Sequence, residues 1–222
     1  MIRHPDQRVA VFIDAQNMYH SAQHVGGGNP NFAEILKEAV AERRLVRAIA
    51  YVVRGKTGTE QAFFDALVKL GIEAKEKDLQ EFASGAKKAD WDVGLAVDAI
   101  RISELVDVVV ICSGDGDFIP LVEYLQHRGR IVEVASFRPT TSGKMQDIVD
   151  EFIDLAADLK RYVIRRRQRR GAADDEEGGR ARGRASSFVP VLVLIHAGRR
   201  TGSSTGRNQG SGIRGQDTTA DF

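Results

Sequence analysis

The chain has 222 residues, a formal net charge of +1 at pH 7 and a hydrophobic share of 42%. This length suits one domain of ordinary size with additional sequence, and the apolar share is enough for a core. No run approaches the ~20 apolar residues that cross a bilayer, and the N-terminus lacks the pattern of a signal peptide. The single cysteine, Cys112, excludes an internal disulfide, and we expect it to pack as a small hydrophobe. These features predict a soluble, cytoplasmic protein.

The charge is unevenly distributed along the chain. Residues 165–222 contain 12 Lys and Arg against 6 Asp and Glu, which gives +6, whereas the first 164 residues carry −5. Residues 171–187 and 198–222 have the small, polar composition of disordered chain. We therefore predict an acidic domain over residues 1–164 and a basic, largely disordered tail over 165–222. Within the tail, the apolar segment Phe188–Ile195 is consistent with an extra strand, a partner-binding segment or no function.

Strand-like and helix-like patterns alternate through the first 164 residues. Apolar, β-branched runs predict strands at Arg8–Ile13, Val46–Val53, Gly71–Ala74, Asp107–Cys112 and Arg130–Ala135. Apolar residues at helical spacing predict helices at Phe32–Ala41, Glu60–Leu70, Asp90–Leu105, Ile119–Arg128 and Met145–Tyr162. We expect Gly71 and Gly129 to end the second and fourth of these helices. The alternation predicts an α/β fold with an open, mostly parallel sheet and helices on both faces.

Carboxylates follow two of the predicted strands. Asp14 ends the first strand, and Asp115 and Asp117 follow the fourth. In an open parallel sheet, ligands bind outside the carboxyl ends of the strands, near the point where the strand order reverses. If these two strands are neighbours, their ends bring the three carboxylates together. We expect Gly114 and Gly116 to permit a tight turn that directs the two later acids inward.

A fourth acid can come from the predicted helix Asp90–Leu105. Asp90 is a suitable N-cap, which would place Asp92 in the first turn, near the mouth of the sheet. Asp98 lies roughly 120° around the helix from Asp92, at 3.6 residues per turn. Because both cannot point at one metal ion, we rank Asp92 before Asp98.

The predicted acidic cluster calls for a hard cation. Clustered carboxylates repel one another, so they normally coexist by coordinating such an ion. Mg²⁺ or Mn²⁺ suits oxygen ligands and can activate water against a phosphodiester. Zinc is not favoured, because the chain has no Cys/His cluster. The five histidines, which show no ligand spacing, are His4, His20, His24, His127 and His196.

Each candidate residue also has a structural interpretation. An Asp after a strand is often a helix N-cap, and residues 113–117 could form only a turn. We consider it less favoured that all the acids at this edge of the sheet have only structural roles. Asn17 is either a cap for the following helix or a residue that orients a metal ligand. Lys87 and Lys88 are more often a solvated loop than a phosphate clamp. Trp91 is more often part of a core than a surface on which a base stacks.

Three motifs, in this order, resemble the NYN domain family. They read FIDAQN from Phe12, KADWDVGLAVD from Lys88 and SGDGDF from Ser113. More narrowly, they are similar to the LabA-like branch of that family, which is related to PIN-domain ribonucleases. The resemblance covers roughly residues 8–160 and does not extend to the tail.

The resemblance implies a PIN-like (Rossmann-like) sheet and a Mg²⁺ or Mn²⁺ site that cuts RNA endonucleolytically. It assigns metal binding and catalysis to four residues: Asp14, Asp92, Asp115 and Asp117. Asn17 and Ser113 would orient ligands or waters, and Asp98 matches a further family aspartate whose role stays open. Trp91 departs from the apolar or small residue that the branch often has, which bears on substrate preference more than on chemistry.

We therefore predict a metal-dependent endoribonuclease that acts on single-stranded RNA, with no membrane partner. The basic residues that we expect to attract phosphate are Lys87, Lys88, Arg165, Arg166, Arg167, Arg169 and Arg170, followed in the tail by Arg180, Arg182 and Arg184. The tail also offers a place for a second copy of the chain or another protein partner.

Two other functions compete with this prediction. The first is a catalytically weak or inactive regulatory module of the same family that binds RNA or protein. The second is a metal-dependent phosphatase or phosphotransferase, which usually needs an acid nucleophile with a nearby acid–base carboxylate. Gln16, two residues after Asp14, lacks that capacity, so we rank the second alternative low.

Overall fold

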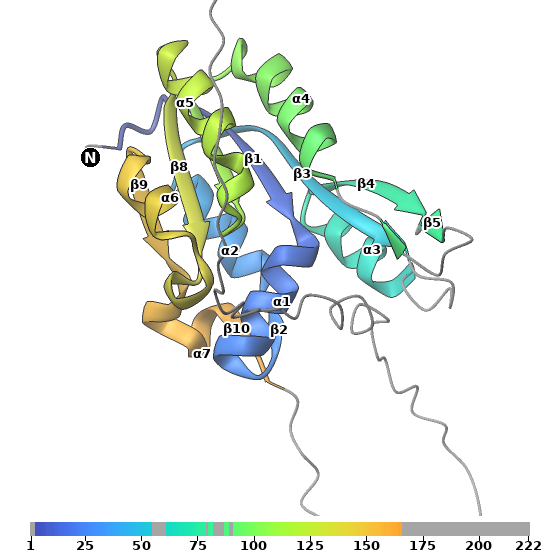
Figure 1. The fold of residues 1–222 in the computed structure, drawn as a ribbon. Helices are drawn as coiled ribbons and strands as arrows, with labels where there is room; N and C mark the ends of the chain where they lie inside the picture. The colour runs from blue at the N-terminus through green and yellow to red at the C-terminus, as the bar shows by residue number, and fades with distance from the viewer. Residues whose placement is uncertain (1–2, 55–60, 79, 82–86, 89–90, 166–222) are drawn as a thin grey trace, which may run out of the picture. The chain divides into compact units, whose positions relative to one another are not determined.

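A six-stranded sheet forms the centre of the computed structural model, which describes residues 3–54, 61–78, 80–81, 87–88 and 91–165 (Figure 1). The strand order is β4-β3-β1-β7-β8-β9, and all five neighbouring pairs are parallel. The strands are β1 (Arg8–Asp14), β3 (Arg44–Arg54), β4 (Glu73–Asp78), β7 (Val108–Cys112), β8 (Ile131–Ser136) and β9 (Glu151–Asp154).

The strand order reverses between β1 and β7. From β1 the chain adds β3 and β4 on one side, and then returns to place β7, β8 and β9 on the other. Ile13 pairs with Cys112, so the two strands end at the same level. These two strands are therefore neighbours, as is required if the acids at their ends are to lie close together.

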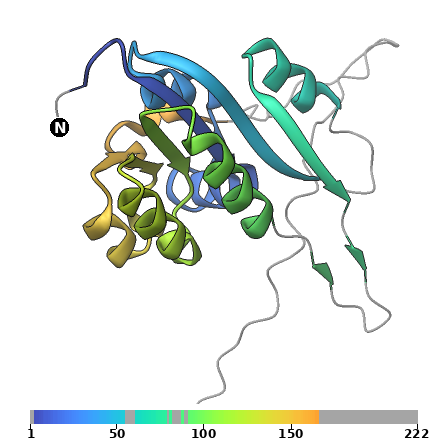
Figure 2. The ribbon, with the colours of Figure 1, turned by 90° about the horizontal axis from the view of Figure 1, so that it is seen from above.

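Helices cover both faces of the sheet, as predicted (Figures 1 and 2). They are α1 (Ala15–Gly26), α2 (Phe32–Val40), α3 (Gln61–Lys69), α4 (Asp92–Ser103), α5 (Ile119–His127), α6 (Gly143–Ile148) and α7 (Leu159–Tyr162). The buried residues of α1, α2 and α3 pack on one face, and those of α4, α5 and α6 pack on the other.

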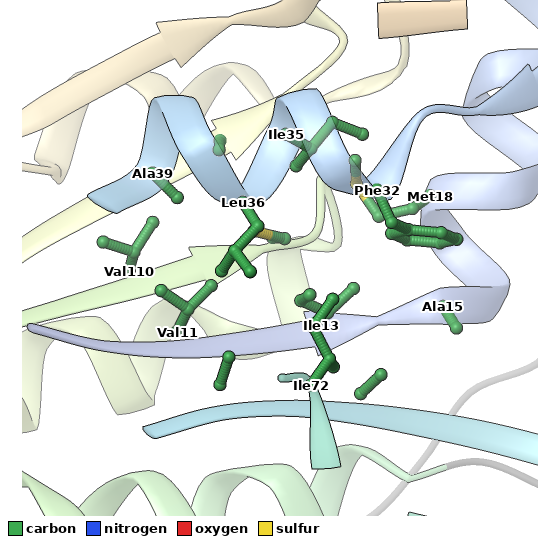
Figure 3. Close-up of a cluster of buried hydrophobic side chains, with 14 of the residues drawn as sticks. Val11, Ile13, Ala15, Met18, Phe32, Ile35, Leu36, Ala39, Ile72 and Val110 are labelled. Carbon is green, nitrogen blue, oxygen red and sulfur yellow. The ribbon is translucent and has the colours of Figure 1, made fainter. Parts of the chain in front are cut away.

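The central strand β1 supplies side chains to both cores. Val11 and Ile13 face α1 and α2 (Figure 3), whereas Phe12 belongs to the core beneath α4 and α5. Burial of one such side chain stabilises the fold by about 1.5–3 kcal/mol. Cys112 is fully buried in the first core, which confirms its predicted packing, and burial raises the pKa of its thiol to about 12.

The prediction of one helix over Met145–Tyr162 is wrong. Helix α6 ends at Ile148, β9 follows, and the chain continues through a short 3₁₀ turn, η3 (Leu155–Asp158), into α7. The Oδ2 atom of Asp150 accepts a hydrogen bond from the Val132 N–H of β8 (2.8 Å), and β9 then pairs with β8. Pairing with an existing strand overrides the helical spacing of the local apolar residues.

The other predicted elements are present, with shifted ends. The weak strand at Gly71–Ala74 begins and ends later, as β4. Gly71 (φ 73°) and Gly129 (φ 74°) follow α3 and α5 in the left-handed conformation expected of helix-ending glycines.

Helix α1 is not among the predicted helices, and four short strands besides β9 were not predicted. They form two antiparallel pairs, which are β2 (Asn29–Pro30) with β10 (Val163–Ile164) and β5 (Gln80–Glu81) with β6 (Lys87–Lys88). The pairing with β10 ties the end of the described chain to the segment after α1. Residues 166–222 lie outside the described residues, so the domain boundary after residue 164 stays a prediction, as does the character of the tail.

Candidate metal centre

Asp14 is the last residue of β1 and the N-cap of α1. Its Oδ1 atom accepts a hydrogen bond from the Asn17 N–H (3.0 Å), and its Oδ2 atom accepts one from the Ser113 hydroxyl (3.3 Å). Burial raises the pKa of Asp14 to about 6; the hydrogen bond from Asn17 opposes this rise, and the nearby charges of Asp92 and Asp115 add to it. The carboxyl group is thus held in place where a negative charge is unfavourable.

The loop after β7 is tied to the end of β1 and the first turn of α1. Besides its bond to Asp14, the buried Ser113 Oγ accepts a hydrogen bond from the Asp115 N–H (3.2 Å). The side-chain Oδ1 of Asn17 accepts one from the Gly114 N–H (2.9 Å). The interpretation of Asn17 as a helix cap is wrong, because Asp14 is the N-cap and Asn17 only donates its N–H to it. The side chain of Asn17 instead positions the loop that carries Asp115.

Asp115 caps the short 3₁₀ turn η1 (Gly116–Phe118). Its Oδ1 atom accepts a hydrogen bond from the Asp117 N–H (3.0 Å). This bond is an ordinary turn contact, as the structural interpretation requires. The side chain of Asp117 takes no part in this bond and is exposed, and no ion pair of Asp117 is found within the described part of the chain.

The glycines of this loop are required for space rather than for a special backbone turn. Neither Gly114 nor Gly116 has the positive φ that would demand glycine, which corrects the prediction. A Cβ atom on Gly114 would lie 2.9 Å from Thr141 Oγ1 and 3.0 Å from Ser136 Oγ, and one on Gly116 would lie 3.1 Å from Ser142 Oγ. The segment after β8 therefore packs directly against the loop, and small residues are needed where the two meet.

Asp92 reaches the site from the first turn of α4. The N-cap position is Trp91, which makes no side-chain capping bond, and the predicted cap Asp90 lies outside the described residues. Trp91 donates a hydrogen bond from Nε1 to the Val52 carbonyl (3.0 Å) and meets Tyr51 edge to face, with ring centroids 5.5 Å apart. Trp91 is thus anchored to β3, consistent with its interpretation as part of the core, and it fixes where α4 begins.

Three of the four predicted ligands converge. One carboxylate oxygen each from Asp92, Asp115 and Asp117 lie within 4.8 Å of one another. Oxygen ligands lie about 2.0–2.6 Å from a bound Mg²⁺ or Ca²⁺, so oxygens at this spacing fit around one small, hard ion. Asp92 and Asp115 are partly buried and Asp117 is exposed, so the cluster opens to solvent. It could therefore hold a divalent metal ion.

Asp98 takes part in a different network. Its Oδ2 atom accepts hydrogen bonds from the Tyr51 hydroxyl (2.7 Å) and the Lys75 ammonium (2.6 Å). Although burial opposes it, the Lys75 and Tyr51 bonds hold the pKa of Asp98 below its ordinary value. The structure does not bring Asp98 into the cluster with Asp92, in agreement with their separation around the helix.

The predicted phosphate-binding residues are only partly described. Lys87 and Lys88 form strand β6, but their side chains lie outside the described residues. Arg165 donates a hydrogen bond from Nε to the Gly26 carbonyl (3.0 Å). Arg166, Arg167, Arg169 and Arg170, and the tail arginines after them, fall in residues 166–222 and also lie outside the described residues.

One wall of the site was not predicted. Ser136 ends β8 at the same sheet edge, and with Thr141 it packs against Gly114. The Ser136 hydroxyl is buried and has no hydrogen-bond partner among the described residues. A polar residue directly after an apolar strand was the available signal, the same signal that identified Asp14.

The doubly wound sheet and its acidic cluster define a PIN-like α/β domain. The chain belongs to the NYN domain family, whose family model matches residues 8–156. NYN domains are generally nucleases and generally associate with RNA. No helix in the described part of the chain is long and apolar enough to cross a membrane.

The chain is also similar to individual proteins. It is 29% identical to the low amplitude and bright protein LabA of Synechococcus elongatus, over 70% of this chain and 87% of LabA. It is 24% identical to an uncharacterized protein of Methanocaldococcus jannaschii, over 71% of this chain and 59% of that protein. A crystal structure of a protein of unknown function from Vibrio parahaemolyticus matches with a TM-score of 0.66 and 31% identity, covering 74% of this chain and 100% of that one. The resemblance to the LabA-like branch is confirmed.

Proposed function

We propose that this protein is a metal-dependent endoribonuclease. The observation that carries the proposal is the convergence of Asp92, Asp115 and Asp117 to within 4.8 Å at the carboxyl ends of β1 and β7. This is where an open parallel sheet binds its ligands. Membership of a family whose proteins are generally RNA-associated nucleases gives the substrate class.

The three converging aspartates would hold Mg²⁺ or Mn²⁺, with Asp14 as a fourth acidic neighbour. When bound, the ion supplies positive charge against the phosphodiester and lowers the pKa of a water molecule. Asp14 accepts hydrogen bonds on both carboxyl oxygens, and its charge adds to the attraction for the cation. Ser113 and Asn17 position the loop that carries Asp115.

An acidic site must attract a polyanion by other groups. We assign this role to the basic residues Lys87, Lys88 and Arg165–Arg170. Contacts of this kind release counterions from RNA, so the affinity falls with salt in proportion to the number of phosphates neutralised. Replacing the arginines at 166, 167, 169 and 170 by glutamine should lower RNA affinity and flatten its salt dependence, and an unchanged slope would remove this part of the proposal.

The test is cleavage of an end-labelled, mixed-sequence single-stranded RNA with Mn²⁺ or Mg²⁺. Cutting should require the metal, stop with EDTA and disappear in Asp115→Asn. The matched control is Asp147→Asn, which removes one exposed aspartate of α6 outside the cluster and should leave cutting unchanged.

The same experiment separates the alternatives. If the protein binds metal and RNA but no substrate is cut, it is the regulatory module of the same family. If it hydrolyses a small phosphomonoester and not RNA, it is a phosphatase.

A further inference from the structure

A pocket lies at the edge of the sheet where β1 ends in Asp14. Its volume is about 290 Å³, and it is formed where the carboxyl end of β3 meets the beginnings of α1 and α2 and one side of α3. A water molecule occupies about 30 Å³, so this space is not a packing defect. Its size is at the lower end of the roughly 300–1,000 Å³ found for small-molecule sites. We refer to it as the β3–α1 pocket.

Among the described residues, the lining of the β3–α1 pocket is mainly apolar and contains three aromatic side chains. It includes the rings of Tyr19, Phe32 and Phe63, and the rings of Phe32 and Phe63 lie with centroids 5.8 Å apart. No Asp, Glu, Lys or Arg of the described residues lines it. Flat, neutral rings are therefore the chemistry that it suits, and nucleobases stack on aromatic side chains of this kind.

The pocket also has a polar group that can read a base edge. Gln16 lines it and is partly buried, and its side-chain amide makes no hydrogen bond within the described residues. The neighbouring amide of Asn31 is already used, because it donates to the Arg161 carbonyl (3.1 Å) and accepts from the Glu34 N–H. An amide offers both a donor and an acceptor, which is the pairing that a base edge needs.

The chain itself connects the pocket to Asp14, whose carboxyl group is close enough to Asp92 and Asp115 for their charges to raise its pKa. Ala15 and Gln16, which line the pocket, directly follow Asp14, and consecutive Cα atoms are about 3.8 Å apart. A strand of RNA whose phosphate lies at the aspartates can therefore place a neighbouring base in the pocket.

We propose that the β3–α1 pocket receives one unpaired nucleobase of the RNA next to the bond that is cut. This inference rests on the proposed nuclease function, and it adds a source of base preference. Because the base must leave its stack to enter, the pocket selects single-stranded RNA over a duplex.

The test uses the full chain and fills the pocket from its rim. Ala66 lines the pocket from α3 and is exposed, so Ala66→Trp adds a large side chain without removing core. The matched control is Val68→Trp, on the same helix, where Val68 is 67% exposed and does not line the pocket. Binding of a short, fluorescein-labelled single-stranded RNA is measured by anisotropy with Ca²⁺ in place of Mg²⁺, so that a cation offsets the carboxylates, and a gel checks that the RNA stays intact.

Loss of one stacked base weakens binding by roughly 5- to 100-fold. We expect a loss in this range for Ala66→Trp and none for Val68→Trp. An abasic nucleotide scanned along the RNA should weaken wild-type binding at one position and have no effect there on Ala66→Trp. Equal affinities for both tryptophan variants and wild type, or equal losses in both, would overturn the inference.

A second variant and a cleavage readout keep the two proposals distinguishable. Gln16→Ala should change the preference among the four homopolymer RNAs with little change in stability, so the pocket is tested even if Ala66→Trp does not fold. If wild-type protein cuts RNA but Ala66→Trp cuts at the same positions with the same affinity, the pocket inference fails and the nuclease proposal stands. If Ala66→Trp loses affinity but nothing is cut, the pocket does bind a base of the RNA, whereas the nuclease proposal fails and with it the placement of that base next to a cut bond.

Discussion

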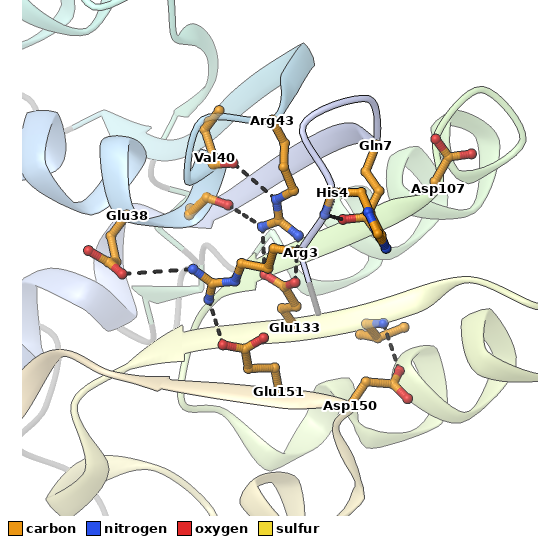
Figure 4. Close-up of polar contacts among 12 residues, drawn as sticks. Arg3, His4, Gln7, Glu38, Val40, Arg43, Asp107, Glu133, Asp150 and Glu151 are labelled. Atoms are coloured by element: carbon orange, nitrogen blue, oxygen red, sulfur yellow. Dashed lines mark hydrogen bonds and ion pairs between the residues drawn. The ribbon is translucent and has the colours of Figure 1, made fainter. Parts of the chain in front are cut away.

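Acidic residues near the amino ends of the strands and those at the carboxyl ends of β1 and β7 are partnered in opposite ways. Towards the amino ends of the strands, acids are paired with arginines (Figure 4). Arg43 contacts Glu133 (2.6 Å), Arg3 contacts Glu151 (2.6 Å) and Arg8 contacts Asp107 (2.7 Å). At the carboxyl ends, Asp14, Asp115 and Asp117 make no ion pair with a described Lys or Arg, and they lie close to one another.

The comparison shows which end is built for the fold and which for a ligand. A carboxylate beside a guanidinium is satisfied within the chain. Carboxylates beside one another raise each other's free energy until a cation arrives from outside. Removing an acid at the amino ends should therefore destabilise the protein, and removing Asp14, Asp115 or Asp117 should stabilise it or have little effect.

The largest effect is expected for Glu133→Ala. Both partners of this ion pair are almost completely inaccessible, with side-chain exposures of 1% for Arg43 and 0% for Glu133. Arg43 also donates to the Ala39 and Val40 carbonyls at the end of α2. Leaving the guanidinium buried without its carboxylate should lower the free energy of unfolding by about 3–5 kcal/mol, measured by urea denaturation.

The matched control for this prediction is the double variant Arg43→Met with Glu133→Leu. Replacing a buried pair by apolar residues of similar volume is often neutral or stabilising, so the double variant should recover most of the lost stability. A double variant as unstable as Glu133→Ala would show that packing, and not the unpaired charge, is responsible.

The next effect is stabilisation by metal at the opposite end. Saturating Mn²⁺, at about a hundred times its dissociation constant, should raise the free energy of unfolding by roughly 2.7 kcal/mol. The double variant Asp115→Asn with Asp117→Asn should lose this increase, because it removes two of the three converging ligands. Asp107→Asn removes a carboxylate from the amino end and should keep it. Thermal unfolding of the wild type and of both variants, with and without Mn²⁺, measures the stabilisation. Equal stabilisation in all three proteins would show that the ion does not bind at the aspartate cluster.

Asp14→Asn should stabilise the metal-free protein. The folded-state pKa of about 6 lies above the ordinary 3.8, so the unfavourable charge is absent below about pH 4, develops as the pH rises and is complete above about pH 6. Asparagine keeps the acceptor that caps α1. We expect a gain of roughly 1–2 kcal/mol at pH 8 and almost none at pH 4, measured by urea denaturation in EDTA. A gain of the same size at both pH values would show that the charge of Asp14 is not its cause.

How far the sequence predicts this molecule depends on how local each signal is. Short apolar runs that end in Asp14 or precede Asp115 are local, and they predict both the strands and the edge of the sheet at which the acids lie. The angular separation of Asp92 and Asp98 around one helix is also local, and it correctly separates the cluster from the Lys75 network.

The features that the sequence does not predict depend on distant partners. Strand β9 forms because Glu151 and its neighbours pair with β8 and because Arg3, 148 residues earlier, contacts Glu151. The β3–α1 pocket is lined by residues of six elements, including β2 and β10, and no run of residues encodes that space. Ser136 could have been suspected from its place at the end of β8, but not that its hydroxyl faces Gly114.

The smallest effect is expected for Asp107→Asn, at the amino end of β7. The hydrogen bond from Arg8 holds the pKa of Asp107 down at about 2, so the pair stabilises the fold above about pH 4 and loses this contribution as the pH falls towards 2. Both side chains are largely exposed, and water and salt screen such a pair. Asp107→Asn should therefore lower the melting temperature slightly at neutral pH and low salt, less at high salt and not at all near pH 2. A loss as large as that of Glu133→Ala, or one that persists at low pH, would show that the two ends of the sheet do not differ in the way their acids suggest.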